Sequence, residues 1–327
     1  MNHNTDGFIN WLYNKKMQGN SLINCSEKEL EELLLEKRKL FCEKMGLNLI
    51  ESWQHKPDFR ILDSEQKDGY KKYSGEITTL PNLVVPFYIL EPEKYIGTVI
   101  YTTGHGDGVI ETIDEMRSSD YQKALPIQLV KKGYRVYLTE PIGFGGVTYA
   151  RFKEPELSGC YANSVIMLLH GLTLAGLRVN QTIQIADYIN KEENKKPFLA
   201  GISGGGLVTA FTAAVYKNIA GAFISCYTNT FFGSIMAMNH CIDNYVHDVL
   251  SVGEEPEIIS LAVSTPILVS AGTEDSIFPL GYTNEACESI RSIYRRFSAE
   301  DKFEVEIFTG THEISTKALF PWLEKHQ

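Results

Sequence analysis

A serine set among glycines is the first feature of this sequence whose residue types could do chemistry. Residues 201–205 read Gly-Ile-Ser-Gly-Gly, which fits the pattern G-x-S-x-G around Ser203. The apolar residues 197–200 precede it and the apolar residues 207–215 follow it. In such a strand–turn–helix context the serine acts as a nucleophile, because the helix start offers free N–H groups that stabilise negative charge. We favour this interpretation over a serine that only caps a helix. A phosphate-binding loop is disfavoured because no lysine follows the glycines.

A serine nucleophile needs a base, and the base needs an acid that orients it. In a site of this kind the three follow one another along the chain as serine, acid and histidine. Asp275 follows an apolar segment that ends in a glycine, and we predict it as the acid, with Glu274 as the alternative. His312 follows the last β-rich segment, and the only later histidine is His326, near the end of the sequence. The predicted catalytic triad is therefore Ser203, His312 and Asp275.

Acyl transfer to a serine also requires donors for the oxyanion. One donor is predicted to be the backbone N–H of Gly204, directly after the nucleophile. The other should come from a loop after an early strand, and residues 104–108, Gly-His-Gly-Asp-Gly, fit that place. We predict the backbone N–H of His105 as this donor, with Asp107 as the alternative if the register differs.

The elements that must position these residues alternate between β-rich and helical patterns, which indicates a mostly parallel sheet with helices on both faces. Helical spacing marks residues 175–189 and 286–297, and a capping box at Ser26 and Glu29 starts a helix that should stop at Gly46. The predicted strands are Leu83–Leu90, Thr98–Thr103, Tyr134–Thr139, Pro197–Ile202, Ala222–Cys226, Pro266–Ala271 and Phe303–Thr309. In the last of these, apolar residues alternate with Glu304 and Glu306, which predicts a strand near the sheet edge with a more exposed face.

This pattern predicts an N-terminal helical extension over residues 1–57 and a catalytic domain over residues 58–327. The net charge of −10 disfavours nucleic acid as a partner. The N-terminus has no basic segment followed by a long apolar core, and no stretch is long and apolar enough to span a bilayer. We therefore expect a cytoplasmic protein without a membrane partner.

No cofactor or metal ion is predicted. The six cysteines form no C-x-x-C pair, so free thiols are expected. His240, Cys241 and His247 match no standard zinc spacing, and we interpret them as pocket wall or core.

The assembled motifs resemble those of the α/β-hydrolase superfamily, and within it of bacterial serine esterases similar to acetylxylan esterases and dienelactone hydrolases. The resemblance extends over about residues 68–322 and rests on ordered segments that include GHGDG, KKGYRVYLTEPIGFGG, LTLAGLRVNQTIQIADYI, GISGGG, ILVSAGTEDSIFP and GTHE. It implies the α/β-hydrolase fold and a triad that cleaves an ester, through an acyl-enzyme that water hydrolyses.

Two segments depart from that family pattern, and both bear on the substrate. The oxyanion strand ends in Thr103-Gly104 in place of the family's frequent His-Gly, and residues 140–145 replace an Asp-x-Arg-Gly-x-Gly segment. Dienelactone hydrolases proper use a cysteine nucleophile, whereas residue 203 is serine. The resemblance implies a small acyl ester as substrate. Acyl transfer or amide cleavage by the same triad, or a non-catalytic binding protein, are the alternatives, and the N-terminal helices offer a surface for a homo-oligomer.

Overall fold

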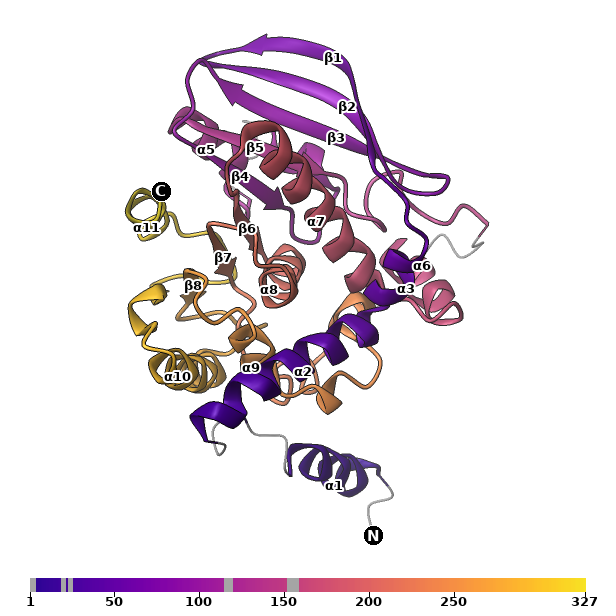
Figure 1. Ribbon diagram of the computed structural model, residues 1–327, viewed down its shortest axis with the longest axis vertical. Helices are drawn as coiled ribbons and strands as arrows, with labels where there is room; N and C mark the ends of the chain where they lie inside the picture. Colours follow the sequence, from indigo (N-terminus) through magenta and orange to yellow (C-terminus); the bar gives the residue numbers. More distant parts are fainter. Residues whose placement is uncertain (1–3, 19–21, 23–25, 115–119, 152–158) are drawn as a thin grey trace.

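One sheet of nine strands forms the centre of the described structure. The computed structural model describes residues 4–18, 22, 26–114, 120–151 and 159–327 (Figure 1). The strands are β1 (Asp58–Lys67), β2 (Tyr70–Leu80), β3 (Leu83–Pro92), β4 (Gly97–Thr102), β5 (Tyr134–Thr139), β6 (Phe198–Ile202), β7 (Gly221–Ser225), β8 (Ile267–Gly272) and β9 (Phe303–Phe308). The helices are α1 (Asp6–Met17), α2 (Glu27–Met45), α3 (Leu47–Ser52), α4 (Val109–Thr112), α5 (Leu125–Lys131), α6 (Gly159–Leu168), α7 (Leu174–Glu193), α8 (Gly204–Val215), α9 (Glu255–Ser260), α10 (Leu280–Arg296) and α11 (Leu319–Lys325), with short 3-10 helices η3 (Ile242–Asn244), η4 (Val249–Ser251) and η5 (Glu300–Lys302).

The strand order is β1-β2-β3-β5-β4-β6-β7-β8-β9. The first three strands are antiparallel and form the curved end of the sheet, and β3 pairs antiparallel with β5 (Figure 1). All pairs from β5 to β9 are parallel. Parallel strands bring the loops after their carboxyl ends to one edge of the sheet, so the loops after β4, β6, β8 and β9 share that edge. The mostly parallel sheet that the sequence predicts is confirmed.

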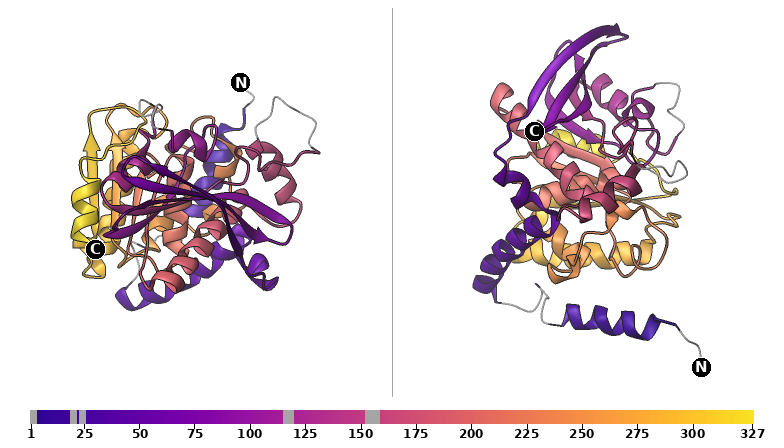
Figure 2. Two further views of the ribbon diagram at one scale, coloured as in Figure 1. Left: turned by 90° about the horizontal axis from the view of Figure 1, so that it is seen from above. Right: turned by 90° about the vertical axis from the view of Figure 1, so that its right-hand side faces the viewer.

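The parallel strands are buried on both faces, and their side chains divide the core into two clusters. In β6, Leu199 packs into one cluster, while Phe198 and Ala200 on the opposite face pack into the other. Residues of α2, α7, α8, α9 and α10 complete the first cluster, and residues of α5 and α11 complete the second. Helices therefore cover both faces of the sheet, as predicted (Figure 2). No helix among the described residues is long and apolar enough to cross a membrane.

All seven predicted strands are present, with ends that differ by no more than two residues. The sequence analysis did not predict β1 and β2. Their residues are mostly polar, and β1 is exposed along nearly its whole length because it is an edge strand. Period-two alternation is therefore missing there, and the remaining signal is the two-residue turn Asp68-Gly69, a typical hairpin connection.

β9 lies at the opposite edge of the sheet, as predicted. The expectation that its glutamates mark an exposed face is wrong for Glu306, which is only 9% exposed. Its carboxylate accepts hydrogen bonds from the hydroxyls of Ser270 and Ser315 and from the backbone N–H of Ala318. Thus the segment between β9 and α11 covers this face and supplies the polar partners that a buried carboxylate requires.

The predicted capping box is confirmed at the start of α2, where Ser26 accepts from the backbone N–H of Glu29 and the Glu29 carboxylate accepts from that of Ser26. The helix ends at Gly46, which has a left-handed backbone, also as predicted. Phe41 of α2 is fully buried, with its ring 4.9 Å from that of Phe211 in α8, in an edge-on arrangement. α2 therefore packs into the same core as the parallel sheet. α1 lies at the end of the molecule farthest from β1–β3 (Figures 1 and 2).

Replacing Phe41 with alanine tests whether α2 is part of the cooperative core. We expect Phe41→Ala to lower the free energy of unfolding by about 3–5 kcal/mol, because it leaves a cavity against α8. Urea unfolding followed by circular dichroism and by tryptophan fluorescence should give one shared transition at lower urea. Leu35→Ala, on the exposed side of the same helix, is the control and should change stability by less than about 1 kcal/mol. A Phe41→Ala protein as stable as the control would contradict the expectation.

Candidate active site

Ser203 occupies the turn between β6 and α8. Its backbone has φ 56° and ψ −123°, a conformation that is costly for a residue with a side chain and that marks functional turns. The Ser203 hydroxyl does not cap α8, and it makes no hydrogen bond within the described residues. The helix-cap interpretation therefore does not account for this serine, whose hydroxyl is left available at the start of α8.

The turn is so tight that neighbouring atoms fill the space that side chains at Gly201 and Gly205 would need. A methyl group on Gly205 would collide with the Thr102 carbonyl oxygen at the end of β4 and would lie 2.8 Å from the Thr103 carbonyl oxygen. A methyl group on Gly201 would lie 2.7 Å from the Thr209 hydroxyl of α8. Only glycine allows α8 to start this close to the strand ends. The glycines around Ser203 thus serve close packing of helix on sheet.

The loops after β8 and β9 bring Asp275 and His312 together. The Nδ1 atom of His312 lies 2.8 Å from Oδ2 of Asp275. The other oxygen, Oδ1, accepts from the backbone N–H groups of Ile277 at 2.8 Å and Phe278 at 3.0 Å. Burial opposes the charge of this carboxylate, whose side chain is 1% exposed, but the hydrogen bond and attraction of His312 and the two backbone N–H groups together lower the pKa of Asp275. Glu274, the alternative acid, is exposed, and so Asp275 is the carboxylate that orients the imidazole.

Two aromatic rings hold the His312 imidazole. The rings of Tyr121 and Phe278 stack on it at centroid distances of 5.7 Å and 5.8 Å. Because Nδ1 is bound to Asp275, Nε2 is the nitrogen left for proton transfer. The structure has no hydrogen bond between His312 and Ser203, and such bonds commonly tighten only when substrate binds.

The two predicted oxyanion donors are free to act. Within the described residues, the backbone N–H groups of Gly204 and His105 have no hydrogen-bond acceptor. The alternative, Asp107, has its N–H bound to a carboxylate oxygen of Glu111 at 2.7 Å. This bond occupies the Asp107 N–H, so of the two candidates His105 is the one whose N–H has no acceptor within the described residues.

A second histidine–carboxylate pair lies beside the turn, and the sequence analysis did not predict it. Nε2 of His105 lies 2.9 Å from Oδ2 of Asp243, a residue of η3 whose side chain is 1% exposed. Arg178 of α7 contacts the same oxygen through Nη1, and its Nη2 lies 3.0 Å from Sγ of Cys160. The sequence carried a signal for a buried acidic partner, because Arg178 is a charged residue within the buried stripe of α7, but that signal identified neither Asp243 nor its pairing with His105.

These side chains also raise the question of a metal ion. The ligand atoms of His105, Cys160, Cys241 and Asp243 all lie within 4.8 Å of one another. However, the Arg178 guanidinium already contacts the Asp243 carboxylate and the Cys160 sulfur. It thus provides the positive charge that a metal ion would otherwise bring to these ligands. Charge balance within the cluster is reached without an ion, and the donor set does not favour a metal centre.

A hollow of about 590 Å³ opens between α6 and the segment around η3. His240 and Cys241 line it, which confirms their interpretation as pocket wall, whereas His247 is exposed and does not line it. The ring of His240 lies 5.4 Å from that of Phe278, which flanks His312. Ring contacts thus link the wall of this hollow to His312 through Phe278.

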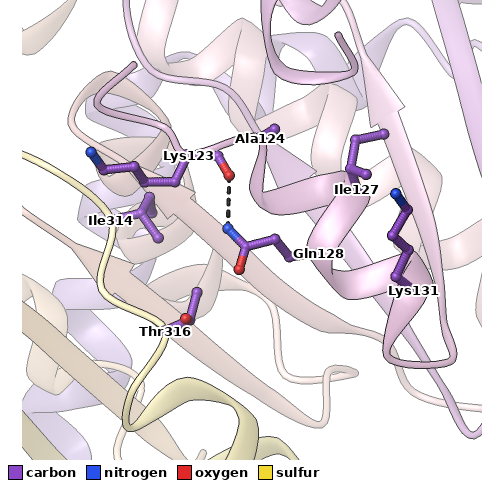
Figure 3. A pocket seen from close by; sticks show the side chains of 7 residues that line it. All are labelled: Lys123, Ala124, Ile127, Gln128, Lys131, Ile314 and Thr316. Carbon is purple, nitrogen blue, oxygen red and sulfur yellow. Dashed lines mark hydrogen bonds between the residues drawn. The ribbon is translucent and has the colours of Figure 1, made fainter. Parts of the chain in front are cut away.

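The hollow in Figure 3 lies elsewhere, between α5 and the segment after His312. Its volume is about 500 Å³, and Gln128 crosses it to donate a hydrogen bond to the Lys123 carbonyl oxygen at 2.7 Å. Neither Ser203, Asp275 nor His312 lines it. It is therefore not a candidate for the substrate pocket.

The sheet order, the strained serine turn and the histidine after the last strand define the class of protein with the α/β-hydrolase fold. The model of the Abhydrolase family matches residues 24–196, more than half of the sequence, and the chain belongs to this family. That match ends before Ser203, so family membership does not by itself assign the site. A comparison with curated proteins finds no match.

Solved structures share the fold at low sequence identity. A Bacteroides fragilis protein described as an acetyl xylan esterase has a TM-score of 0.76 at 14% identity, over 99% of this chain and 95% of that one. A methylesterase has a TM-score of 0.68 at 15% identity, over 92% and 64% of the two chains. A glucuronoyl esterase from Solibacter usitatus has a TM-score of 0.60 at 10% identity, over 82% and 85%. At such identities the likeness establishes the fold alone.

A methyl group at Gly205 provides a test of the tight turn. We expect Gly205→Ala to destabilise the protein by about 1–3 kcal/mol, because the new methyl group forces α8 away from β4. Gly281→Ala is the matched control, since nothing lies within 4 Å of the new methyl group in α10, and it should be neutral or stabilising by up to about 1 kcal/mol. Thermal unfolding of both variants measures the difference. Equal melting temperatures would show that the turn tolerates a side chain.

Proposed function

We propose that this protein is a serine hydrolase that cleaves carboxylic esters through Ser203, His312 and Asp275. The observation that carries the proposal is the hydrogen bond from Nδ1 of His312 to the buried carboxylate of Asp275. These two residues come from loops at the sheet edge where the turn holds Ser203 in its strained conformation. A base oriented by an acid, beside an unbonded serine hydroxyl, is the arrangement that nucleophilic acyl transfer requires.

In the proposed reaction, Nε2 of His312 takes the proton of Ser203 as Oγ attacks the ester carbonyl. The carbonyl oxygen becomes an oxyanion, which accepts hydrogen bonds from the N–H groups of Gly204 and His105. Collapse of this intermediate breaks the bond to the alcohol, which leaves with the proton from His312. Water then donates a proton to His312 and attacks the acyl-enzyme, and the second collapse returns the proton to Ser203 and releases the acid.

Asp275 stabilises the imidazolium that forms in each step. Its charge is fixed before the reaction, because the bond from His312 and two backbone N–H groups hold the carboxylate in its ionised form. Because the acid lies on Nδ1, the imidazole is held in the tautomer that has a lone pair on Nε2. The cost of burying the carboxylate is thereby offset by three hydrogen bonds.

The neighbouring structures and the size of the hollow lined by His240 support a proposal for the substrate class. The proteins of like fold are described as an acetyl xylan esterase, a methylesterase and a glucuronoyl esterase. The first two descriptions name esters with a small group, acetyl or methyl, on one side of the bond, and the first and third name a carbohydrate part. We propose a small ester, carried on a carbohydrate, as the substrate, with the hollow of about 590 Å³ receiving part of it.

Labelling with a fluorophosphonate tests the nucleophile and the base. We expect the native protein to be labelled on one residue, and Ser203→Ala to lose the label because no other hydroxyl is activated. His312→Ala should label very slowly, and both variants should lose at least about 10⁴-fold in kcat on an activated ester.

The controls for this experiment are Ser52→Ala and His170→Ala, which change exposed residues outside the site. Both should label and turn over as the native protein does. A native protein that does not react, or equal labelling of Ser203→Ala, would remove the assignment of the triad.

A substrate series tests the reaction class. We expect kcat/KM to fall from p-nitrophenyl acetate to butyrate to octanoate, since the proposed acyl group is small. The matching anilides should be cleaved far more slowly than the esters, and acetylated xylan should release acetate. Preferred cleavage of anilides, or transfer of the acyl group to added alcohols in place of water, would indicate an amidase or an acyltransferase instead.

A further inference from the structure

The His105–Asp243 pair lies against the nucleophile turn and has no part in the proposed triad. A methyl group built on Gly204 would lie 2.6 Å from Cε1 and 2.7 Å from Nδ1 of His105. Gly204 directly follows Ser203, and its N–H is one of the proposed oxyanion donors. The ring edge that carries Nδ1 therefore packs against Gly204, the residue that supplies this donor.

The orientation of the ring leaves Nδ1 available. Nε2 is bound to Asp243 and the Cys160 sulfur is a further hydrogen-bond partner of the ring, while within the described residues no partner is assigned to Nδ1 itself. Phe144 packs edge-on against the imidazole at a centroid distance of 5.3 Å. The hydroxyl of Tyr121 donates to the His105 carbonyl oxygen at 2.6 Å and anchors its backbone. Asp243 and Phe144 thus hold the ring and Tyr121 holds the backbone of His105, while Nδ1 lies next to Gly204.

The charges around the ring favour its protonated form. Burial opposes a charge on His105 and Arg178 repels one, but the hydrogen bond and attraction of Asp243, together with the thiol of Cys160, raise the pKa of His105 to about 9. The pKa of Cys160 itself is lowered to about 5, first by its hydrogen bond with Cys241. The remaining titratable neighbour is His240, whose pKa is lowered, so that it adds no charge at neutral pH. His105 is accordingly an imidazolium at pH 7.

We propose that the side chain of His105 is a catalytic residue, whose Nδ1–H donates a charge-assisted hydrogen bond to the oxyanion next to the N–H of Gly204. This inference rests on the proposed function and adds a side-chain donor to the two backbone donors. As Ser203 attacks, negative charge moves onto the carbonyl oxygen, and the proton stays on Nδ1 throughout. A donor that carries a full positive charge stabilises such charge more than a neutral amide does.

The protonated form of His105 also means that its side chain cannot act as the base. An imidazolium has no lone pair to accept the serine proton, whereas His312 is oriented through Nδ1 and keeps Nε2 for that purpose. When His105 loses its proton, Nε2 retains the hydrogen bonded to Asp243, so Nδ1 then presents a lone pair to the oxyanion. Activity should therefore be present below the pKa of His105 and be lost as pH rises through about 9.

Steady-state kinetics of His105→Gln on p-nitrophenyl acetate test the proposal. We expect kcat to fall about 100-fold with KM changed by less than about threefold, because the lost bond forms only in the transition state. In the native protein kcat should decrease above pH 9, and this decrease should be absent in His105→Gln. His170→Gln, an exposed histidine, is the matched control and should keep the native kcat and pH profile.

Each outcome decides between failure of this inference and failure of the proposed function. A native protein that neither labels with the fluorophosphonate nor hydrolyses esters overturns the function and this inference with it. Labelled, active native protein with an unchanged kcat in His105→Gln overturns this inference alone. If His105→Gln does not fold, titration of the His105 imidazole by NMR in the native protein decides, and a pKa below 7 overturns the proposal.

Discussion

The close approach of α8 to the ends of β4 and β6 is the constraint on which the rest of the site depends. Gly205 lies against the Thr102 carbonyl oxygen. This contact fixes the start of α8 next to the end of β4, the strand that leads into the His105 loop. That contact forces Ser203 into a left-handed backbone, the strain of which the surrounding sheet must hold. One set of backbone contacts thus determines where the hydroxyl of Ser203 and the N–H of Gly204 lie.

From this turn the loops are joined one to the next. The N–H of Glu274, next to Asp275, is bound to the Gly310 carbonyl oxygen of the His312 loop at 2.8 Å. The N–H of Ile314 is bound to the Tyr121 carbonyl oxygen, also at 2.8 Å, and the Tyr121 hydroxyl reaches His105. The loops that carry Asp275, His312 and His105 are therefore joined by a continuous chain of hydrogen bonds. The site is positioned by neighbouring loops of one parallel sheet edge, although its residues are far apart in the sequence.

Much of this arrangement could be predicted from the sequence, because it follows from local patterns. Strands buried on both faces give continuous apolar runs, and the order of serine, acid and histidine along the chain led to the loops that now lie together. β1 was not predicted because an exposed edge strand lacks the alternation of apolar and polar residues by which a strand is recognised in a sequence. Glu306 was wrongly expected on an exposed face of β9. Its burial depends on contacts with β8 and with the segment before α11, which the alternation of residues along β9 does not reveal.

The pairing of His105 with Asp243 could not be predicted, since it depends on how η3 packs under the oxyanion loop. The His312–Asp275 and His105–Asp243 pairs differ in the nitrogen that is bound. His312 binds its acid through Nδ1 and leaves Nε2, while His105 binds its acid through Nε2 and leaves Nδ1.

The surroundings of the two acids differ as well. Asp275 is held by backbone N–H groups, which are neutral, whereas Asp243 is shared with the fully buried Arg178. Arg178 is always charged and keeps Asp243 ionised. The attraction of Asp243 for the His105 imidazole exceeds the repulsion from Arg178, and so His105 stays protonated. A carboxylate held by neutral donors can instead stabilise an imidazole that gains and loses its proton. Under the proposed mechanism, the same two residue types would therefore supply a fixed positive charge through His105 and a proton carrier through His312.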